Sequence, residues 1–377
     1  MKDEKKAPKL RFKGFIDDWE QRKLGDVAKI TAGGDINKGD LINKGKYPVI
    51  ANGLNNNGIV GYSNKYKIDA PAVTITGRGT LGVATARFIN FTPIVRLISI
   101  KSDLDPIYLE NVINNTHFVI ESTGVPQLTA PQVKRQTVIL SNCHIEQTKI
   151  GSLFLTLDNA ITLHEEKKRQ LERLKSALLQ KMFADKSGYP PVRFEGFSDK
   201  WEQVKYGEIF QRRSKMGVST PTLPSVEYDD INPGMGTLNK EPKSKGISKR
   251  GIYFNPGDVL FGKLRPYLKN WLFACFEGVA VGDFWVLTSS KIDHGFTYSL
   301  IQTPGFQYIA NLSSGSKMPR SDWGLVSNAR TFIPINHLEQ ERISSVLFGL
   351  DHAITLYEHK LEILNKIKSF LLQNMFI

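Results

Sequence analysis

Two copies of one sequence pattern restrict the fold of this chain more than any other feature. Residues 10–27 read LRFKGFIDDWEQRKLGDV and residues 192–210 read VRFEGFSDKWEQVKYGEIF. Two longer segments, 145–183 and 338–376, share EQ, LD, AITL and a final MF. Tandem self-similarity of this kind indicates a repeated architecture. We therefore expect a duplicated unit made of an entry motif, a variable globular part and a long helix.

The offsets between the copies show where the halves differ. Trp19 recurs 182 residues later as Trp201, whereas Asp158 recurs 193 residues later as Asp351. The second half therefore has about eleven more residues between its matching ends. The two halves match at their entry motifs and long segments but differ in the globular parts between them. This suggests one shared scaffold that carries two different recognition parts.

The two longer segments are predicted to be helices that pair with each other. Both are rich in Leu, Lys, Glu, Gln and Arg, and apolar residues recur in alternating steps of four and three. One such helix cannot bury its apolar stripe alone, so antiparallel pairing is expected, although His164, Lys168, Lys175 and Lys368 interrupt the seam. The predicted pairing residues are Leu157, Ile161, Leu171, Leu178, Met182, Leu350, Ile354, Leu361, Leu364, Leu371 and Met375.

The globular parts read as mixed α and β structure. Runs such as PAVTITG, TPIVRLISI, GIYFNPGDVLFG and FWVLTSS are rich in β-formers, whereas DPIYLENVINNT and GFTYSLIQTPGFQYIAN read as short helices. The predicted class is α+β: two tandem mixed α/β domains separated by two long helices that form an antiparallel coiled coil, with internal pseudo-two-fold symmetry. The predicted segments are 1–143, first domain; 144–188, first helix and linker; 189–335, second domain; and 336–377, second helix.

Charge indicates the class of partner. Fifty Lys and Arg against 37 Asp and Glu give a net charge of +13, which favours a polyanion and above all nucleic acid. An anionic membrane surface is the competing interpretation, but no basic amphipathic helix with a Trp- and Phe-rich face supports it. The charged first residues and the presence of only two cysteines predict a cytoplasmic protein without a disulfide framework.

The stretch TITGRGTLGVA, residues 74–84, has the G-x-G-x-x-G spacing of a dinucleotide-binding turn. Such a turn needs a helix after it, yet residues 83–96 read as strand. In the second copy only a glycine followed by a cation is kept, as Gly262-Lys263 beside Gly77-Arg78. The prediction is a tight exit from a strand that presents a cation to DNA; a solvated hairpin is the alternative.

The duplicated RF-x-GF-x-x-x-WE motif, with two long helices that open with EQ and end in LLQ-x-MF, resembles the specificity subunit of type I restriction-modification enzymes. The resemblance implies two target-recognition domains that each read half of a split DNA target. It implies that the helices set the gap between the halves and dock two methyltransferase subunits, with motor-nuclease subunits added for cleavage. S-adenosylmethionine is then expected on the methyltransferase, ATP and Mg on the motor-nuclease, and no cofactor on this chain.

Base reading favours Arg or Lys against guanine and Asn or Gln against adenine. The predicted DNA-binding residues are Asn52, Asn55, Asn56, Arg78 and Gln127 in the first part, and Lys263, Arg265, Tyr267, Lys317 and Arg320 in the second. Turn formation is the alternative for the asparagines, and phosphate contact for the cations. The aromatic residues of the entry motif are expected to pack in a core or against the helices.

No catalytic pattern emerges from the sequence. There is no G-x-x-x-x-G-K-[ST] phosphate loop and no N-P-P-[YF] methylation motif. The E-x-K orders at Glu165 and Glu358 lie on the predicted helices, where a solvated face is expected. Besides a non-catalytic specificity subunit, two alternatives stay open: a stand-alone DNA-binding or regulatory protein with the same duplicated fold, and a cofactor-dependent enzyme, which only the glycines suggest.

Overall fold

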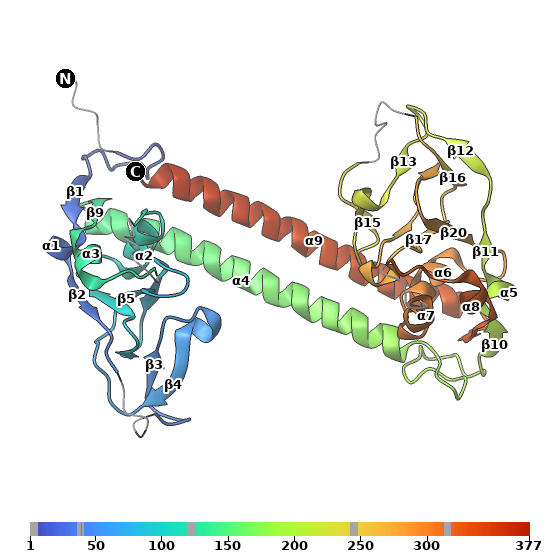
Figure 1. The fold of residues 1–377 in the computed structure, drawn as a ribbon, viewed down its shortest axis with the longest axis horizontal. Helices are drawn as coiled ribbons and strands as arrows, with labels where there is room; N and C mark the ends of the chain where they lie inside the picture. The colour runs from blue at the N-terminus through green and yellow to red at the C-terminus, as the bar shows by residue number, and fades with distance from the viewer. Residues whose placement is uncertain (1–6, 36–38, 40, 119–125, 242–247, 313–317) are drawn as a thin grey trace. The chain divides into compact units, whose positions relative to one another are not determined.

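Contacts divide the chain into two compact units, each of which contains one globular part and portions of both long helices. The computed structural model describes residues 7–35, 39, 41–118, 126–241, 248–312 and 318–377 (Figure 1). Unit 1 consists of Met1–His164 with Leu361–Ile377, and unit 2 of Glu165–Lys360. Across the described ranges, no helix combines the length and apolar character needed to cross a membrane.

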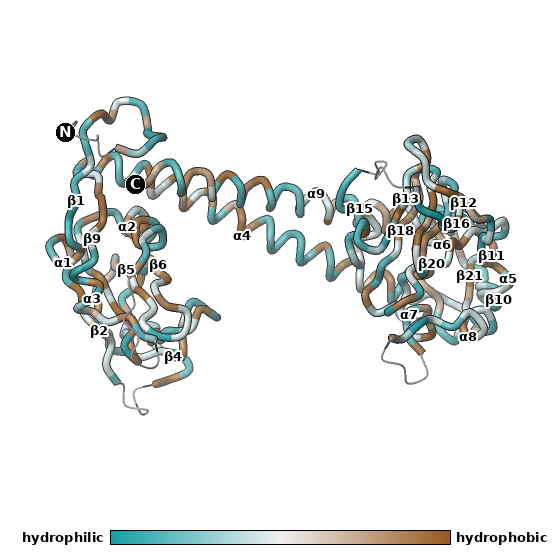
Figure 2. Tube along the Cα trace, turned by 45° about the horizontal axis from the view of Figure 1, so that its top comes forward, coloured by the Kyte–Doolittle hydropathy of each residue, from teal (hydrophilic) through white to brown (hydrophobic). Residues whose placement is uncertain are grey.

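The two predicted long helices are present. Helix α4 spans His144–Lys181 and helix α9 spans His337–Met375. Hydrophobic and hydrophilic residues are mixed along both (Figure 2), as expected for helices with one apolar stripe.

Ion pairs define how the helices run in unit 2. Lys168 of α4 pairs with Glu358 of α9 at 2.7 Å. Seven residues further along α4, Lys175 pairs with Asp351, which lies seven residues earlier on α9. The helices are therefore antiparallel, as predicted. The lysines that interrupt the apolar seam meet acids of the opposite helix.

None of the predicted pairing residues is fully exposed. Ile354 is buried, with 3% of its surface exposed, and most of the others are partly buried. Met182 and Leu178 pack with the core of unit 2, whereas Met375 and Leu371 pack with the core of unit 1. The ends of the apolar stripes therefore belong to the globular cores.

Unit 1 contains a central antiparallel sheet of order β2-β8-β5-β6, a smaller sheet of order β4-β3-β7, and a separate pair β1-β9. Its strands are β1 (Glu20–Lys23), β2 (Lys29–Ala32), β3 (Tyr47–Ile50), β4 (Ile59–Ser63), β5 (Ala72–Ile75), β6 (Ala84–Arg87), β7 (Thr92–Pro93), β8 (Ile98–Lys101) and β9 (Thr137–Leu140). Its short helices are α1 (Leu24–Val27), the 3-10 helix η2 (Asn55–Gly58), α2 (Pro106–Asn114) and α3 (Ala130–Arg135).

Unit 2 repeats this plan with additions. It has a pair β10-β21, a sheet β11-β20-β17-β18, a second sheet β12-β16-β19-β13 and a hairpin β14-β15. Its strands are β10 (Glu202–Lys205), β11 (Gln211–Arg212), β12 (Met216–Val218), β13 (Ser225–Val226), β14 (Ile231–Asn232), β15 (Thr237–Leu238), β16 (Arg250–Phe254), β17 (Val259–Gly262), β18 (Trp271–Phe273), β19 (Gly278–Ala280), β20 (Phe284–Thr288) and β21 (Arg330–Ile333). Its short helices are α5 (Tyr206–Ile209), η3 (Tyr228–Asp230), η4 (Pro266–Leu268), α6 (His294–Ile301), α7 (Pro304–Ala310) and α8 (Trp323–Asn328).

The predicted α+β class is confirmed, and the predicted strand runs mostly form strands. PAVTITG contains β5, and GIYFNPGDVLFG contains β17 and all of β16 except its first residue. TPIVRLISI is divided: β7 and β8 are separated by a left-handed turn at Val95 and Arg96, with φ of 52° and 62°. The sequence reads as continuous strand because Val, Leu and Ile flank the arginine.

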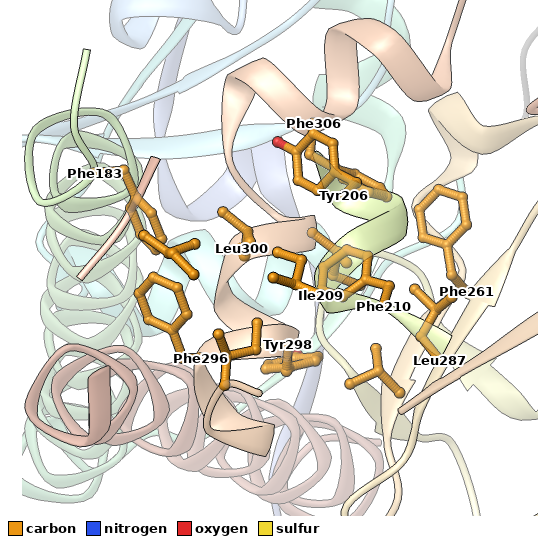
Figure 3. Close-up of a cluster of buried hydrophobic side chains, with 14 of the residues drawn as sticks. Phe183, Tyr206, Ile209, Phe210, Phe261, Leu287, Phe296, Tyr298, Leu300 and Phe306 are labelled. Carbon is orange, nitrogen blue, oxygen red and sulfur yellow. The ribbon is translucent and has the colours of Figure 1, made fainter. Parts of the chain in front are cut away.

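The aromatic ends of the long helices complete the two cores. Phe183 lies just beyond α4, and its ring centroid is 5.5 Å from that of Phe296 in the core of unit 2 (Figure 3). Its repeat equivalent, Phe376, lies just beyond α9, with ring centroids 5.7 Å from Phe154 and 6.3 Å from Trp19 in unit 1. Each core therefore contains the MF end of one repeat helix.

Candidate nucleic-acid interface

Three loops that are distant in sequence lie together in unit 1. Strands β5 and β8 are antiparallel neighbours with Ile75 opposite Ile98, so the exit of β5 lies beside the entry of β8. The third loop joins because the Leu128 amide donates to the Gly77 carbonyl at 3.0 Å. We call this site loop cluster 1. Its residues are Gly77, Arg78, Val95, Arg96, Gln127 and Leu128, together with Asn52 from a fourth loop, whose side chain accepts from the Gly77 amide.

Backbone crowding explains the first glycine of the 77–82 stretch. A Cβ on Gly77 would lie 2.8 Å from the Leu128 carbonyl oxygen and 3.0 Å from that of Arg96. Gly79 and Gly82 have φ of +69° and +78°, which L side chains rarely adopt. Strand β6 follows, so the prediction that no dinucleotide-binding helix follows these glycines is confirmed.

The predicted asparagines hold turns. The Asn52 amide donates to the Val95 carbonyl at 2.5 Å and accepts from the Gly77 amide at 2.7 Å, so it ties two loops of the cluster together. Asn56 has a φ of 51° and donates to the Ile59 carbonyl at 3.3 Å, while Asn55 is exposed in η2. These contacts fit the turn-forming alternative; DNA contact by these residues stays a prediction.

Arg96 joins the cluster although the sequence analysis did not select it. Val95 and Arg96 both adopt left-handed backbone, which costs on the order of 1–3 kcal/mol per residue and tends to occur at functional sites. Arg96 Nη1 donates to Gln127 Oε1 at 3.1 Å, so the predicted Gln127 lies against it. Arg78 is exposed, and it makes no hydrogen bond or ion pair with any other described residue. Loop cluster 1 thus presents two arginines.

Unit 2 builds an equivalent site at the exit of β17. The Lys263 amide donates to the Asp283 carbonyl, and the Ser321 amide donates to the Lys263 carbonyl, both at 2.8 Å. A backbone bridge joins Leu264 to Arg320. We call this site loop cluster 2. Its residues are Gly262, Lys263, Leu264, Arg265, Asp283, Arg320 and Ser321.

An acid lies between the cations of loop cluster 2. Asp283 pairs with Lys263 at 3.5 Å and with Arg320 at 2.9 Å. The sequence analysis selected both cations and missed the acid. Loop cluster 2 therefore differs in charge arrangement from loop cluster 1, where Arg96 meets a neutral amide.

The remaining predicted residues of unit 2 lie around this site. Arg265 has a φ of 48°, and its amide donates to the Pro319 carbonyl at 2.7 Å. Tyr267 follows in η4 with 55% of its surface exposed. Lys317 lies outside the described residues. Within the described ranges, no three His, Cys, Asp or Glu side chains are placed to hold a metal ion.

Comparisons with known proteins find relatives of this duplicated chain. Residues 16–173 match the family model described as type I restriction modification DNA specificity domain. Those residues include loop cluster 1 and most of α4.

By this match, residues 16–173 are similar to a type I DNA specificity domain.

Relatives of this specificity domain extend the match over the chain. The type I restriction enzyme EcoDI specificity subunit of Escherichia coli is 21% identical over 87% of this chain and 77% of its own length. S.MpnORF507P of Mycoplasma pneumoniae, provisionally named a type I specificity subunit, is 29% identical over 35% of this chain. That alignment spans only 38% of the Mycoplasma protein, well below two thirds of its length.

A solved structure supports the fold of the specificity domain and of the remaining chain. The S subunit of a type I restriction-modification system from M. genitalium superposes with a TM-score of 0.72 and 15% identity, covering 98% of this chain and 99% of that one. The resemblance found in the sequence is therefore confirmed. The chain is a relative of the type I specificity subunits and shares their fold.

In unit 1, the entry motif anchors the start of the long helix α4. Arg11 binds Glu146 with two hydrogen bonds, of 2.5 and 2.9 Å, and the Trp19 indole donates to the same carboxylate at 3.1 Å. Burial of Glu146 raises its pKa, but hydrogen bonds from Arg11, Ser141 and Trp19 outweigh burial and hold the pKa below its ordinary value.

The second copy repeats this anchor. Arg193 binds Glu339 with hydrogen bonds of 2.7 and 2.9 Å, and the Trp201 indole donates to Glu339 at 3.3 Å. Trp19 and Trp201 are each only 2% exposed, so the expectation that these aromatic residues pack in the cores is confirmed. Both copies thus maintain the same buried Arg–Glu ion pair, although the number of residues between its partners differs.

Two residues, Arg96 and Asp283, were missed for a shared reason. Each lies just before the strand that pairs with β5 or β17, in a loop whose sequence resembles neither its repeat partner nor a known motif. In TPIVRLISI, the one feature that could have drawn attention to Arg96 is that it is a single charged residue within an apolar run. Only the pairing of β5 with β8 brings Arg96 beside Gly77.

Proposed function

We propose that this chain is the DNA sequence-recognition subunit of a type I restriction-modification complex. Each unit reads one half of a split double-stranded target, and the paired helices set the spacing and dock methyltransferase subunits. Motor-nuclease subunits join the complex for cleavage. The relatives named as type I specificity subunits support this function.

The observation that carries the proposal is the pair of loop clusters. Both are built at the exit of corresponding strands, β5 and β17, yet they display different side chains. Arg78 and Arg96 in one unit, and Lys263 and Arg320 in the other, are the cations available for base edges or phosphates. Two loop clusters that share one scaffold but display different side chains suit two different half-sites.

Exposed apolar residues on the long helices support two equivalent docking sites. Unit 1 exposes Leu163 by 67% and Ile367 by 41%. Their repeat equivalents in unit 2, Leu356 and Leu174, are 45% and 47% exposed. Large apolar side chains in solvent favour a protein partner, and their repetition favours two copies of the same partner. We assign these positions to the two methyltransferase subunits.

Catalysis is assigned to the partners. We infer that S-adenosylmethionine binds the methyltransferase subunits and that ATP and Mg bind the motor-nuclease, while this chain contributes recognition alone. Its excess of cations supplies attraction to the DNA backbone.

Co-expression tests the proposal. Cells that produce this chain with a matching methyltransferase should yield a co-purifying complex and a methylome with one split motif. The chain by itself should bind duplex DNA weakly and methylate nothing. A soluble oligomer that binds DNA specifically, takes no methyltransferase and yields no split motif would instead identify a stand-alone DNA-binding protein.

A further inference from the structure

Asp283 is an unexpected residue for a DNA-binding surface. Its carboxylate lies among cations, is 30% exposed, and would repel DNA phosphates. An acid at this place lowers non-specific affinity, so its contribution must come from what it does to its neighbours. Those neighbours are Arg320 and Lys263.

The backbone fixes where the Asp283 side chain begins. Its carbonyl accepts hydrogen bonds from the Lys263 amide at 2.8 Å and from the Tyr228 hydroxyl at 2.5 Å. Burial raises the pKa of Tyr228 to about 12, so the hydroxyl keeps the proton that it donates. These contacts do not involve the carboxylate, which is left to act on the cations.

The carboxylate occupies one edge of the Arg320 guanidinium. Asp283 Oδ2 accepts from Nε at 3.3 Å and from Nη2 at 2.9 Å. In the described part of the chain, Nη1 makes no hydrogen bond, and the arginine side chain is 57% exposed. The edge formed by Nη1 and Nη2 therefore remains able to donate two parallel hydrogen bonds.

Two parallel acceptors in the major groove are the N7 and O6 atoms of guanine. An unrestrained arginine reaches phosphates as readily as bases, and it loses side-chain entropy when it binds. An arginine already held on one edge is pre-organised for a planar, bidentate acceptor.

We infer that Asp283 is a positioning residue that orients Arg320 to read a guanine in the half-site of unit 2. The inference rests on the proposed function and adds one base and one supporting residue to it. Among the described residues of loop cluster 1 there is no equivalent acid, and Arg96 there donates to the neutral Gln127 amide. The guanine preference should therefore depend on Asp283 in one half-site only.

The test compares methylomes of cells that co-express the methyltransferase with wild type, Asp283→Asn, Arg320→Lys or Glu277→Gln. Glu277→Gln is the charge-matched control, because Glu277 lies just before β19, in a different sheet from β17 and β20, and accepts a hydrogen bond from the Tyr253 hydroxyl. A bidentate arginine–guanine contact discriminates by a factor of roughly 5 to 150. Asp283→Asn should lower the preference for one guanine at least about five-fold, and Arg320→Lys should relax the same position.

The other half-site should stay unchanged in both variants, and Glu277→Gln should match wild type. An unchanged motif in Asp283→Asn, or relaxation at a position other than that of Arg320→Lys, would overturn the inference while leaving the proposed function intact. Relaxation of both half-sites with a lowered melting temperature would also overturn it, because that pattern marks a structural role. A wild-type methylome without any split motif would overturn the proposed function, and the inference with it.

Discussion

Two repeat-equivalent ion pairs between the long helices should contribute very differently to stability. Lys175 and Asp351 in unit 2 correspond, residue for residue, to Lys368 and Asp158 in unit 1. The first pair is buried, with side chains 11% and 13% exposed, whereas the second pair is 30% and 41% exposed. We predict that Lys175→Met is strongly destabilising and that Lys368→Met is not.

The magnitude follows from the carboxylate that Lys175→Met leaves behind. Burial already raises the pKa of Asp351, although Lys175 acts in the opposite direction. Without the lysine, the buried carboxylate must become protonated or remain unpaired. Protonating an aspartate of ordinary pKa 3.8 costs about 4 kcal/mol at pH 7 and about 1.5 kcal/mol at pH 5.

The sign of the pH dependence is therefore fixed. A carboxyl whose folded-state pKa is raised favours folding at low pH, and this stability is lost as pH rises through that pKa. Lys175→Met should cost about 3–4 kcal/mol at pH 7 and clearly less at pH 5. Lys368→Met should cost less than about 1 kcal/mol at both pH values, because its pair is solvated.

Urea unfolding at pH 5 and pH 7, followed by helical circular dichroism, measures both losses. The double variant Lys175→Met/Asp351→Asn should recover most of the stability, since Asn needs no proton to be neutral. Equal losses in the two single variants would refute the reasoning. A Lys175→Met defect as large at pH 5 as at pH 7 would refute it as well.

Three further predictions concern recognition, anchoring and assembly. Arg78→Ala should alter only the half-site read by unit 1 in the methylome; a uniform loss of affinity for all duplexes would mark a phosphate contact instead. Glu146→Gln should cost about 3 kcal/mol at pH 7 in urea unfolding. It should also remove the acid-sensitive part of stability, because the depressed pKa of Glu146 makes its contribution disappear as pH falls. Leu163→Asp or Leu356→Asp alone should leave one methyltransferase bound in size-exclusion measurements with light scattering, and the double variant should bind none.

The sequence repeats by themselves determine much of the architecture of this protein. Equal sequences fold into equal local structure, so the duplicated entry motif, the two long helices and the duplicated plan could be predicted from spacing and periodicity. The buried positions of Trp19 and Trp201 could be expected from the same regularity, because aromatic side chains bury large apolar areas and dominate cores.

Only the tertiary structure determines which charged side chains come together in the two loop clusters. Arg96 and Asp283 lie in unmatched loops, and strand pairing alone places them beside Gly77 and Lys263. Hydrogen bonds between segments tens of residues apart determine which edge of each arginine remains available, and no local pattern encodes that edge. The lysines that interrupt the helical seam follow the same rule: the sequence shows a charge at an apolar position, and only packing shows the acid it meets and how much water that pair excludes.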